Sequence, residues 1–227
     1  MTLRSSFFYL IVYFWTIIYF IVFAPVKFFT RNLAVKLSVV WTGSIIYLAR
    51  LILGIKYRIE GLENIPKTGN FLVASNHQSA WETFFFVYLF GDPVFILKDD
   101  LRRIPVLSNY FEKLGYIYID RKQGFSALKK VINSISYMIK KKIRIFIIFP
   151  QGTRVAPYQK IKLNSGVVAI HKLLKIPVLP IKHNSGLYWK NKKFKKEKGT
   201  IIVRIFPLLK NKNSKEELLK KIEEYFQ

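Results

Sequence analysis

The chain of 227 residues contains no cysteine. Disulfides, thiolate metal sites and a cysteine nucleophile are therefore excluded, and any covalent catalysis must use another group. The sequence also lacks a Gly-x-Ser-x-Gly motif, a P-loop and a His-Glu-x-x-His motif. Their absence removes the sequence markers of an α/β-hydrolase nucleophile, of P-loop phosphate binding and of a zinc protease site.

Acidic residues are scarce, because 13 Asp and Glu stand against 38 Lys and Arg and the net charge is +25. So large an excess indicates an anionic partner, and nucleic acid and an anionic membrane surface are the two candidates. The chain carries no nucleic-acid recognition motif, so we expect a membrane partner and no nucleic acid. Hydrophobic residues make up 51% of the chain, enough for one domain with a sizeable core.

Residues 7–26 form an uncharged apolar run near the amino terminus. As a helix the run would measure about 30 Å, which is the thickness of the hydrocarbon core of a bilayer. It is too long for the apolar part of a signal peptide and has no small-x-small cleavage site, so a membrane segment is predicted. Lys27, Arg31 and Lys36 follow the run, which places the rest of the chain on the cytoplasmic side if the segment spans.

A second apolar run, residues 37–49, ends at Arg50. It is too short to cross a bilayer comfortably, so an interfacial helix, a re-entrant helix or one packed on the domain is predicted. Two helices that dip into one leaflet are therefore an alternative to a single crossing. In either case residues 1–55 are expected to form membrane-associated helices in the cytoplasmic (inner) membrane.

From residue 56 onward, short apolar runs alternate with helical patterns. Helices are predicted after Ser126, after Ser165 and after the capping box Ser214-x-x-Glu217. This alternation predicts an α/β fold for residues 56–227, with a mostly parallel central sheet flanked by helices. The runs rich in β-branched and aromatic residues that predict strands are 71–74, 94–97, 116–119, 143–149, 178–181 and 201–206.

His77 lies between the strand predicted at 71–74 and a helix predicted after Ser79. Catalytic groups collect in such turns of an open α/β sheet, and an imidazole takes a proton near neutral pH. Glu82 would orient that imidazole, provided that His77 precedes the helix. However, Ser79-x-x-Glu82 also matches a capping box, so Glu82 has a second interpretation as a helix cap.

The motif Phe149-Pro150-x-Gly152-Thr153-Arg154 follows the most apolar of the predicted strands. The proline and the glycine force a sharp turn, which by itself predicts only a loop. The same turn also suits an anion, because backbone N–H groups and the arginine fork match the oxygens of a phosphate.

Together these motifs resemble the glycerolipid acyltransferase family, most of all bacterial lysophosphatidic acid acyltransferases (1-acyl-sn-glycerol-3-phosphate O-acyltransferases). Glu82 stands where that family more often has Asp. Gln151 stands where it usually has Glu, and this loss of a charge leaves the effect of Gln151 open. The resemblance rests on four blocks in the family's order: Asn76-His77-x4-Glu82; Lys98-Asp99-Asp100-Leu101 with Pro105, Gly115 and Ile119-Asp120-Arg121; Phe149-Pro150-x-Gly152-Thr153-Arg154; and residues 176–181.

The resemblance implies transfer of a fatty acyl group from acyl-CoA or acyl carrier protein to the free hydroxyl of lysophosphatidic acid, giving phosphatidic acid. It implies His77 as general base, Glu82 as the group that orients it, and Lys98 and Arg154 as ligands of the acceptor phosphate. No metal or cofactor is implied, and the expected partners are the two substrates and membrane lipids. The residues implied to bind substrate are Lys98, Arg121, Gln151, Gly152, Thr153 and Arg154.

Two rival functions stay open at this point. A related acyltransferase that acts on glycerol 3-phosphate or another lysolipid would carry the same motifs, and a non-enzymatic basic membrane protein would make His77 and Glu82 incidental. Residues 190–198 hold six Lys and one Glu. They are expected to form a solvated loop, with attraction to anionic lipid as the alternative. His171 is expected to be structural within a helix, and His183 to lie in a loop.

Overall fold

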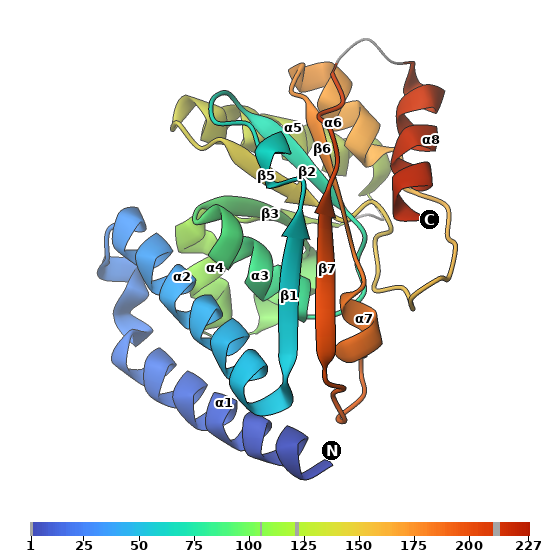
Figure 1. Cartoon of the computed structure of the whole chain (residues 1–227). Coiled ribbons are helices and arrows are strands. Elements are labelled where there is room, and N and C mark those ends of the chain that lie inside the picture. The colour runs from blue at the N-terminus through green and yellow to red at the C-terminus, as the bar shows by residue number, and fades with distance from the viewer. Residues whose placement is uncertain (1, 105, 121–122, 211–213) are drawn as a thin grey trace.

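A single sheet wrapped by helices makes up the computed structural model (Figure 1), which describes residues 2–104, 106–120, 123–210 and 214–227. The helices are α1 Thr2–Val22, α2 Arg31–Leu48, α3 Trp81–Phe90, α4 Leu107–Leu114, α5 Gly124–Lys140, α6 Gly166–Leu174, α7 Ser185–Tyr188 and α8 Lys215–Phe226. Shorter helical segments are η1 Ala24–Phe28, η2 Ala49–Leu53, η3 Leu62–Asn64 and η4 Asp99–Arg103. The strands are β1 Ile55–Glu60, β2 Phe71–Ser75, β3 Pro93–Lys98, β4 Ile117–Ile119, β5 Ile145–Ile148, β6 Val178–His183 and β7 Gly199–Ile205.

Within the described residues the sheet has seven strands in the order β1-β7-β6-β2-β5-β3-β4. Neighbouring strands are parallel except for β6 and β7. β1 and β7 therefore run opposite to the other strands, whose carboxyl ends share one edge. β2 lies between β5 and β6, so the chain segments that leave these three strands meet at that edge.

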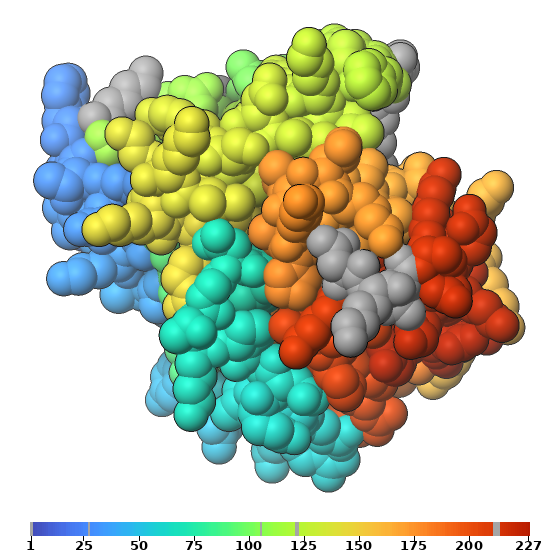
Figure 2. Space-filling view, turned by 90° about the horizontal axis from the view of Figure 1, so that it is seen from above, coloured from blue at the N-terminus to red at the C-terminus, as the bar shows by residue number. Residues whose placement is uncertain are grey.

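Helices cover both faces of the sheet, as the alternating side chains of a strand require. Val73 of β2 belongs to the buried cluster that includes residues of α1, α2 and α3. Its neighbour Leu72 belongs to the cluster on the opposite face, which includes residues of α5, α6 and α8. These last three helices lie side by side (Figure 2). The core thus consists of two apolar layers, one on each side of the sheet.

The predicted α/β class with a mostly parallel sheet is confirmed. All six predicted strands are present, with ends shifted by at most two residues. The predicted capping box is confirmed too, because Ser214 Oγ accepts from Glu217 N (3.1 Å) and Glu217 Oε2 accepts from Ser214 N (2.7 Å). The sequence patterns do not predict β1 or α4.

α1 and α2 form a helical hairpin that contacts the rest of the chain at both of its ends. Near the start of α1, Lys196 N donates to Ser5 Oγ (3.0 Å), and near its end Tyr110 Oη donates to Phe23 O (3.0 Å). Between these points Phe8 is buried in the same cluster as residues of the sheet. The hairpin therefore lies along the domain (Figure 1) and does not project from it.

Both helices of the hairpin are long and apolar enough to cross a membrane, at Thr2–Val22 and Arg31–Leu53. From the sequence, the second apolar run, residues 37–49, is expected to be too short to cross a bilayer. This expectation is wrong, because the helix begins at Arg31 and continues through η2. The apolar helices indicate membrane association. The boundary at residue 55 between the membrane-associated helices and the α/β domain stays a prediction. The large side chains of α1 that are more than half exposed are Leu3, Phe7, Leu10, Tyr13, Phe14, Ile17, Ile21 and Val22.

Candidate active site

Three chain segments meet at the carboxyl edge of the sheet. They follow β2, β5 and β6, which are neighbours in the strand order. His77 lies in the turn between β2 and α3, as predicted. Val155 N donates to His77 O (2.8 Å), and Asn76 Nδ2 donates to His183 O (2.8 Å). These bonds fasten the turn that carries His77 to the two segments beside it.

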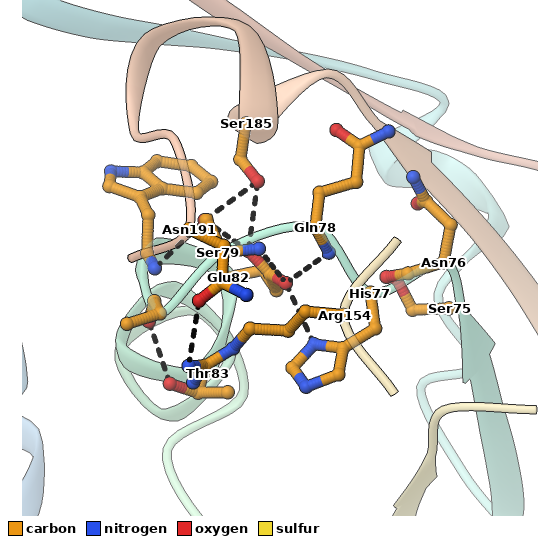
Figure 3. A network of polar contacts seen from close by, with 12 residues as sticks. Ser75, Asn76, His77, Gln78, Ser79, Glu82, Thr83, Arg154, Ser185 and Asn191 are labelled. Atoms are coloured by element: carbon orange, nitrogen blue, oxygen red, sulfur yellow. Dashed lines mark hydrogen bonds and ion pairs between the residues drawn. The ribbon is translucent and has the colours of Figure 1, made fainter. Parts of the chain in front are cut away.

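Glu82 is completely buried, and its carboxylate accepts hydrogen bonds from several donors (Figure 3). Oε1 lies 2.9 Å from His77 Nδ1 and accepts from the backbone N–H groups of Gln78 and Ser79, both at 2.8 Å. Oε2 accepts from Ser79 Oγ (2.5 Å) and from Ser185 Oγ (2.8 Å). Donors in this number stabilise the ionised carboxylate.

The charge of Glu82 decides which nitrogen of His77 carries the hydrogen. Burial alone would raise the pKa of Glu82, but the hydrogen bonds from His77 and Ser79 outweigh burial and hold that pKa well below its usual range. Glu82 is therefore an anion at neutral pH and only accepts, so His77 Nδ1 is the donor. In a neutral imidazole the free lone pair then lies on Nε2, the atom left to take a proton.

Both interpretations of Glu82 describe part of this geometry. Glu82 lies in the first turn of α3 and accepts from Ser79 N, as the acid of a capping box does. The Ser79 hydroxyl does not complete the box, because it donates to Glu82 and accepts from Trp81 N (3.0 Å). A single carboxylate thus closes the start of the helix and contacts His77.

The turn after β5 supports His77 from a second side. The Phe149 ring stacks on the imidazole, with ring centroids 4.1 Å apart and 19° between the planes. Gln151 Oε1 accepts from His77 N (2.6 Å). This contact requires an acceptor oxygen and not a charge, so an amide satisfies it as well as a carboxylate would.

His77 and Arg154 line one cavity of about 590 Å³. Gly152 lines the same cavity and has a φ of 74°, a conformation that glycine adopts without steric cost. Arg154 is exposed, and its Nη1 donates to Asn191 Oδ1 (3.4 Å), so the guanidinium extends past the imidazole (Figure 3). The cavity therefore presents a proton acceptor and a cation to the same space.

The other residues implied by the resemblance divide into two groups. Lys98 lines the cavity of His77 and forms an ion pair with Asp100. Gln151 lines a neighbouring cavity of about 540 Å³. Thr153 is exposed and is not among the described residues that line either cavity. Arg121 lies outside the described residues.

Two residues that the sequence patterns do not assign to the site lie next to it. His183 was expected in a loop. This expectation is wrong, because His183 is the buried last residue of β6. Its Nε2 donates to Asn76 O (2.9 Å), and its Nδ1 accepts from Ser185 N (3.4 Å). Burial lowers the pKa of His183, which favours the neutral ring that this pair of bonds requires. Ser185 then reaches Glu82, and no sequence motif marks it.

His171 is buried in α6, and its Nδ1 donates to Ile176 O (2.6 Å). This contact agrees with the structural role expected for it.

Among the described residues, no group of three or more His, Cys, Asp or Glu could hold a metal ion.

Fold and site together define a class of protein: a membrane-associated α/β protein with a histidine–carboxylate pair suited to deprotonating a hydroxyl beside a cation. Comparison with known families agrees with this class, because the profile of the family named Acyltransferase matches residues 56–184, more than half of the chain. The chain therefore belongs to the acyltransferase family.

Named relatives and a solved structure give a finer similarity. The chain is 38% identical over 169 residues to a 1-acyl-sn-glycerol-3-phosphate acyltransferase of Pseudomonas aeruginosa, covering 74% of this chain and 65% of the relative. It is 34% identical over 120 residues to the protein of the same name of Borreliella burgdorferi, covering 52% of this chain and 47% of the relative. The chain thus spans less than two thirds of the length of these relatives. The crystal structure of the 1-acyl-sn-glycerophosphate (LPA) acyltransferase PlsC from Thermotoga maritima superposes with a TM-score of 0.77 and 26% identity, covering 99% of this chain and 94% of that one.

Proposed function

We propose that this protein is a lysophosphatidic acid acyltransferase that moves a fatty acyl group from acyl-CoA or acyl carrier protein to the free hydroxyl of lysophosphatidic acid, forming phosphatidic acid. The observation that carries the proposal is that His77 and Arg154 line the same cavity. The names of the similar proteins support it.

In this proposal His77 Nε2 takes the proton of the acceptor hydroxyl while the hydroxyl oxygen attacks the thioester carbon. Glu82 holds Nδ1 and stabilises the imidazolium that forms. When the tetrahedral intermediate collapses, the C–S bond breaks and the thiolate leaves with the proton from His77. Direct transfer is favoured because Ser75 and Ser79 are completely buried, with hydroxyls that donate to Asn76 O and to Glu82.

Arg154 binds the acceptor phosphate, with Lys98 as a second cation lining the same cavity. A guanidinium matches two phosphate oxygens, and fixing the phosphate positions the hydroxyl at the base. Arg154→Ala is therefore expected to raise the KM for lysophosphatidic acid by about 10- to 100-fold, the loss of one charge-assisted hydrogen-bonding group, with a smaller effect on kcat.

Initial rates over a range of lysophosphatidic acid concentrations measure this effect. Arg58→Ala is a matched control, because Arg58 lies in the edge strand β1 and pairs with Glu60 (2.8 Å), away from the cavity. An unchanged KM for the Arg154 variant would move the phosphate site elsewhere.

A smaller cavity of about 260 Å³ suits an acyl chain. Tyr19 of α1, Trp41 of α2 and Phe84 of α3 line it together with other apolar side chains. It shares Leu97 and Arg154 with the cavity of His77. An acyl chain could enter this cavity between the membrane helices and the domain and extend to the cavity of His77. Apolar side chains would cover its methylene groups along the way.

The hairpin of α1 and α2 holds the enzyme at the bilayer, where its lysolipid substrate resides. Because the hairpin contacts the domain at both ends, through Ser5 and Phe23, we favour two helices that enter one leaflet over a single crossing. In this proposal the catalytic part, residues 56–227, lies on the cytoplasmic side. Residues 1–55 form the membrane part in this proposal.

Gln151 is expected to act through its oxygen. Gln151→Glu should therefore keep kcat within about threefold, whereas Gln151→Leu leaves His77 N–H unpaired and should lower kcat about tenfold or more. Steady-state assays of both variants, with circular dichroism as a check of folding, measure the difference. Equal activity of the leucine variant and the wild type would show that the bond between Gln151 and His77 does not position the base.

The activity itself is tested with the purified chain and lysophosphatidic acid, using acyl-CoA and acyl carrier protein as alternative donors. Product analysis should show phosphatidic acid with at least one donor. Parallel reactions with glycerol 3-phosphate and lysophosphatidylcholine define the acceptor. Acylation of either of these, in the absence of phosphatidic acid formation, would reassign the substrate within the family.

A further inference from the structure

Residues 190–198, which we call the lysine loop, connect α7 to β7 next to the amino-terminal end of α1. The loop holds six lysines and one acid, Glu197, which pairs with Lys195 (3.4 Å). The lysine side chains are exposed, with the exception of Lys196. So many like charges over nine residues repel one another unless an anion lies near them.

The buried Lys196 gives the loop its shape. Its Nζ donates to Lys190 O (3.0 Å) and to Lys193 O (2.5 Å), which closes the loop around the ammonium group. The same group lies 5.9 Å from the ring centroid of Tyr9 and 5.5 Å from that of Trp189. A lysine folded inward in this way fixes the backbone, and the remaining lysines point into solvent.

The loop is attached to the membrane helix α1. Lys196 N donates to Ser5 Oγ (3.0 Å), and Phe194 stacks on Tyr9 with ring centroids 5.0 Å apart. Phe194 is itself 53% exposed, and Phe7 and Tyr13 of α1 are likewise more than half exposed. The cationic loop is therefore continuous with the apolar surface that indicates membrane association.

A cavity of about 310 Å³ lies between the loop and Arg154. Lys190, Lys192, Lys193 and Lys196 line it, and no acidic residue is among its described lining residues. Burial first, and then the charge of Arg154, lowers the pKa of Lys196 to about 8. This space is cationic, because lysines and Arg154 line it without a carboxylate among its described lining residues, and such a space attracts a phosphate group.

We propose that the lysine loop is a binding surface for anionic phospholipid, which holds the phosphate headgroups of the bilayer beside α1. Membrane attachment then has an electrostatic part in addition to the apolar helices. An anionic carrier protein would also match the charge. A bilayer is favoured because the exposed Phe194 and the apolar face of α1 adjoin the lysines, an arrangement typical of an interfacial anchor.

The test uses the full chain purified in neutral detergent micelles and titrated with phosphatidylglycerol or phosphatidylcholine in the same detergent. A lysine near an anionic lipid surface contributes about fivefold in affinity, so the triple variant Lys190→Ala, Lys192→Ala, Lys193→Ala should bind phosphatidylglycerol about a hundredfold more weakly than the wild type. Its weak binding of phosphatidylcholine should not change.

The matched control replaces Lys215, Lys220 and Lys221, which are exposed on α8, with alanine. This control removes the same charge and should keep the affinity for phosphatidylglycerol. Equal losses in the two triple variants, or no loss in the loop variant, would overturn the proposal. Lys192→Ala alone should show about a fivefold loss, which keeps the test valid if the triple variant fails to fold.

Two further arms separate the possible ligands. Inorganic phosphate at the concentration of the lipid should not displace phosphatidylglycerol, and displacement would assign the loop to free phosphate instead. A loop variant with unchanged lipid affinity but weaker binding of acyl carrier protein would assign it to the donor protein. The lipid titration does not depend on acyl transfer, so it distinguishes a failure of this proposal from a failure of the proposed activity.

Discussion

Replacing His77 with alanine is expected to lower kcat for phosphatidic acid formation by about 10²- to 10⁴-fold, the usual contribution of a general base. The KM for lysophosphatidic acid should stay within about threefold, because this variant retains Arg154, the proposed phosphate ligand. The physical reason is the position of the imidazole. It lines the cavity shared with Arg154, and Glu82 occupies Nδ1, so Nε2 has no substitute as the proton acceptor.

The experiment compares single-turnover rates and substrate affinities of the wild type and of His77→Ala and His77→Gln. His171→Gln is the matched histidine control, because His171 is buried in α6 and contacts Ile176 O, away from the cavity. That control should lose stability and keep kcat per folded molecule. Equal turnover of His77→Ala and the wild type would show that His77 is not the base. The reaction proposed for the shared cavity would then be wrong.

The local part of the site is readable from the sequence. His77, Ser79 and Glu82 lie within six residues, so the strand ending at Ser75 and the helix signal after Ser79 suffice to place them in one turn. Strand positions are predicted as well, because short runs of β-branched and aromatic residues between turn signals are typical of buried strands. β1 is missed because it is an edge strand in which only Ile55 is buried and polar residues alternate with apolar ones, so its apolar signal is weak.

The distant part of the site depends on strand order, which local patterns do not encode. Ser185 reaches Glu82 and Gln151 reaches His77 because β2 lies between β6 and β5. Local sequence patterns do not favour this strand order over other strand orders that would bury the same strands. His183 was misplaced for a related reason. The polar run 183–186 has the composition of a loop, yet its first residue is buried by contacts with Asn76.

Glu82→Gln is the second substitution with a large expected effect, and it separates the two roles of this carboxylate. The amide has nearly the same shape, and the hydroxyls of Ser79 and Ser185 can rotate to accept from its nitrogen, so the helix start should survive. The charge that stabilises the imidazolium of His77 is lost. We expect kcat to fall by about 10³- to 10⁴-fold, as when the carboxylate of a catalytic triad becomes an amide.

Glu82→Asp keeps the charge and places the residue more common in the family at this position, so it should recover much of the activity. If Glu82 were only a helix cap, Glu82→Gln would leave kcat per folded molecule unchanged. Steady-state kinetics corrected for the folded fraction, measured by thermal denaturation in detergent, distinguish these outcomes for the glutamine and aspartate variants.

The pH dependence of stability gives an independent test of the same residue. The pKa of Glu82 in the folded chain lies below the ordinary value of 4.5, so its ionised form stabilises the fold. This stabilisation is complete above the pKa of the unfolded chain and is lost as the pH falls through the lower pKa of the folded chain. The difference in melting temperature between the wild type and Glu82→Gln should therefore shrink as the pH falls below about 4. A difference that stayed constant into acid would mean that the buried group is not an anion, and His77 would then lack the partner on which its role as a base depends.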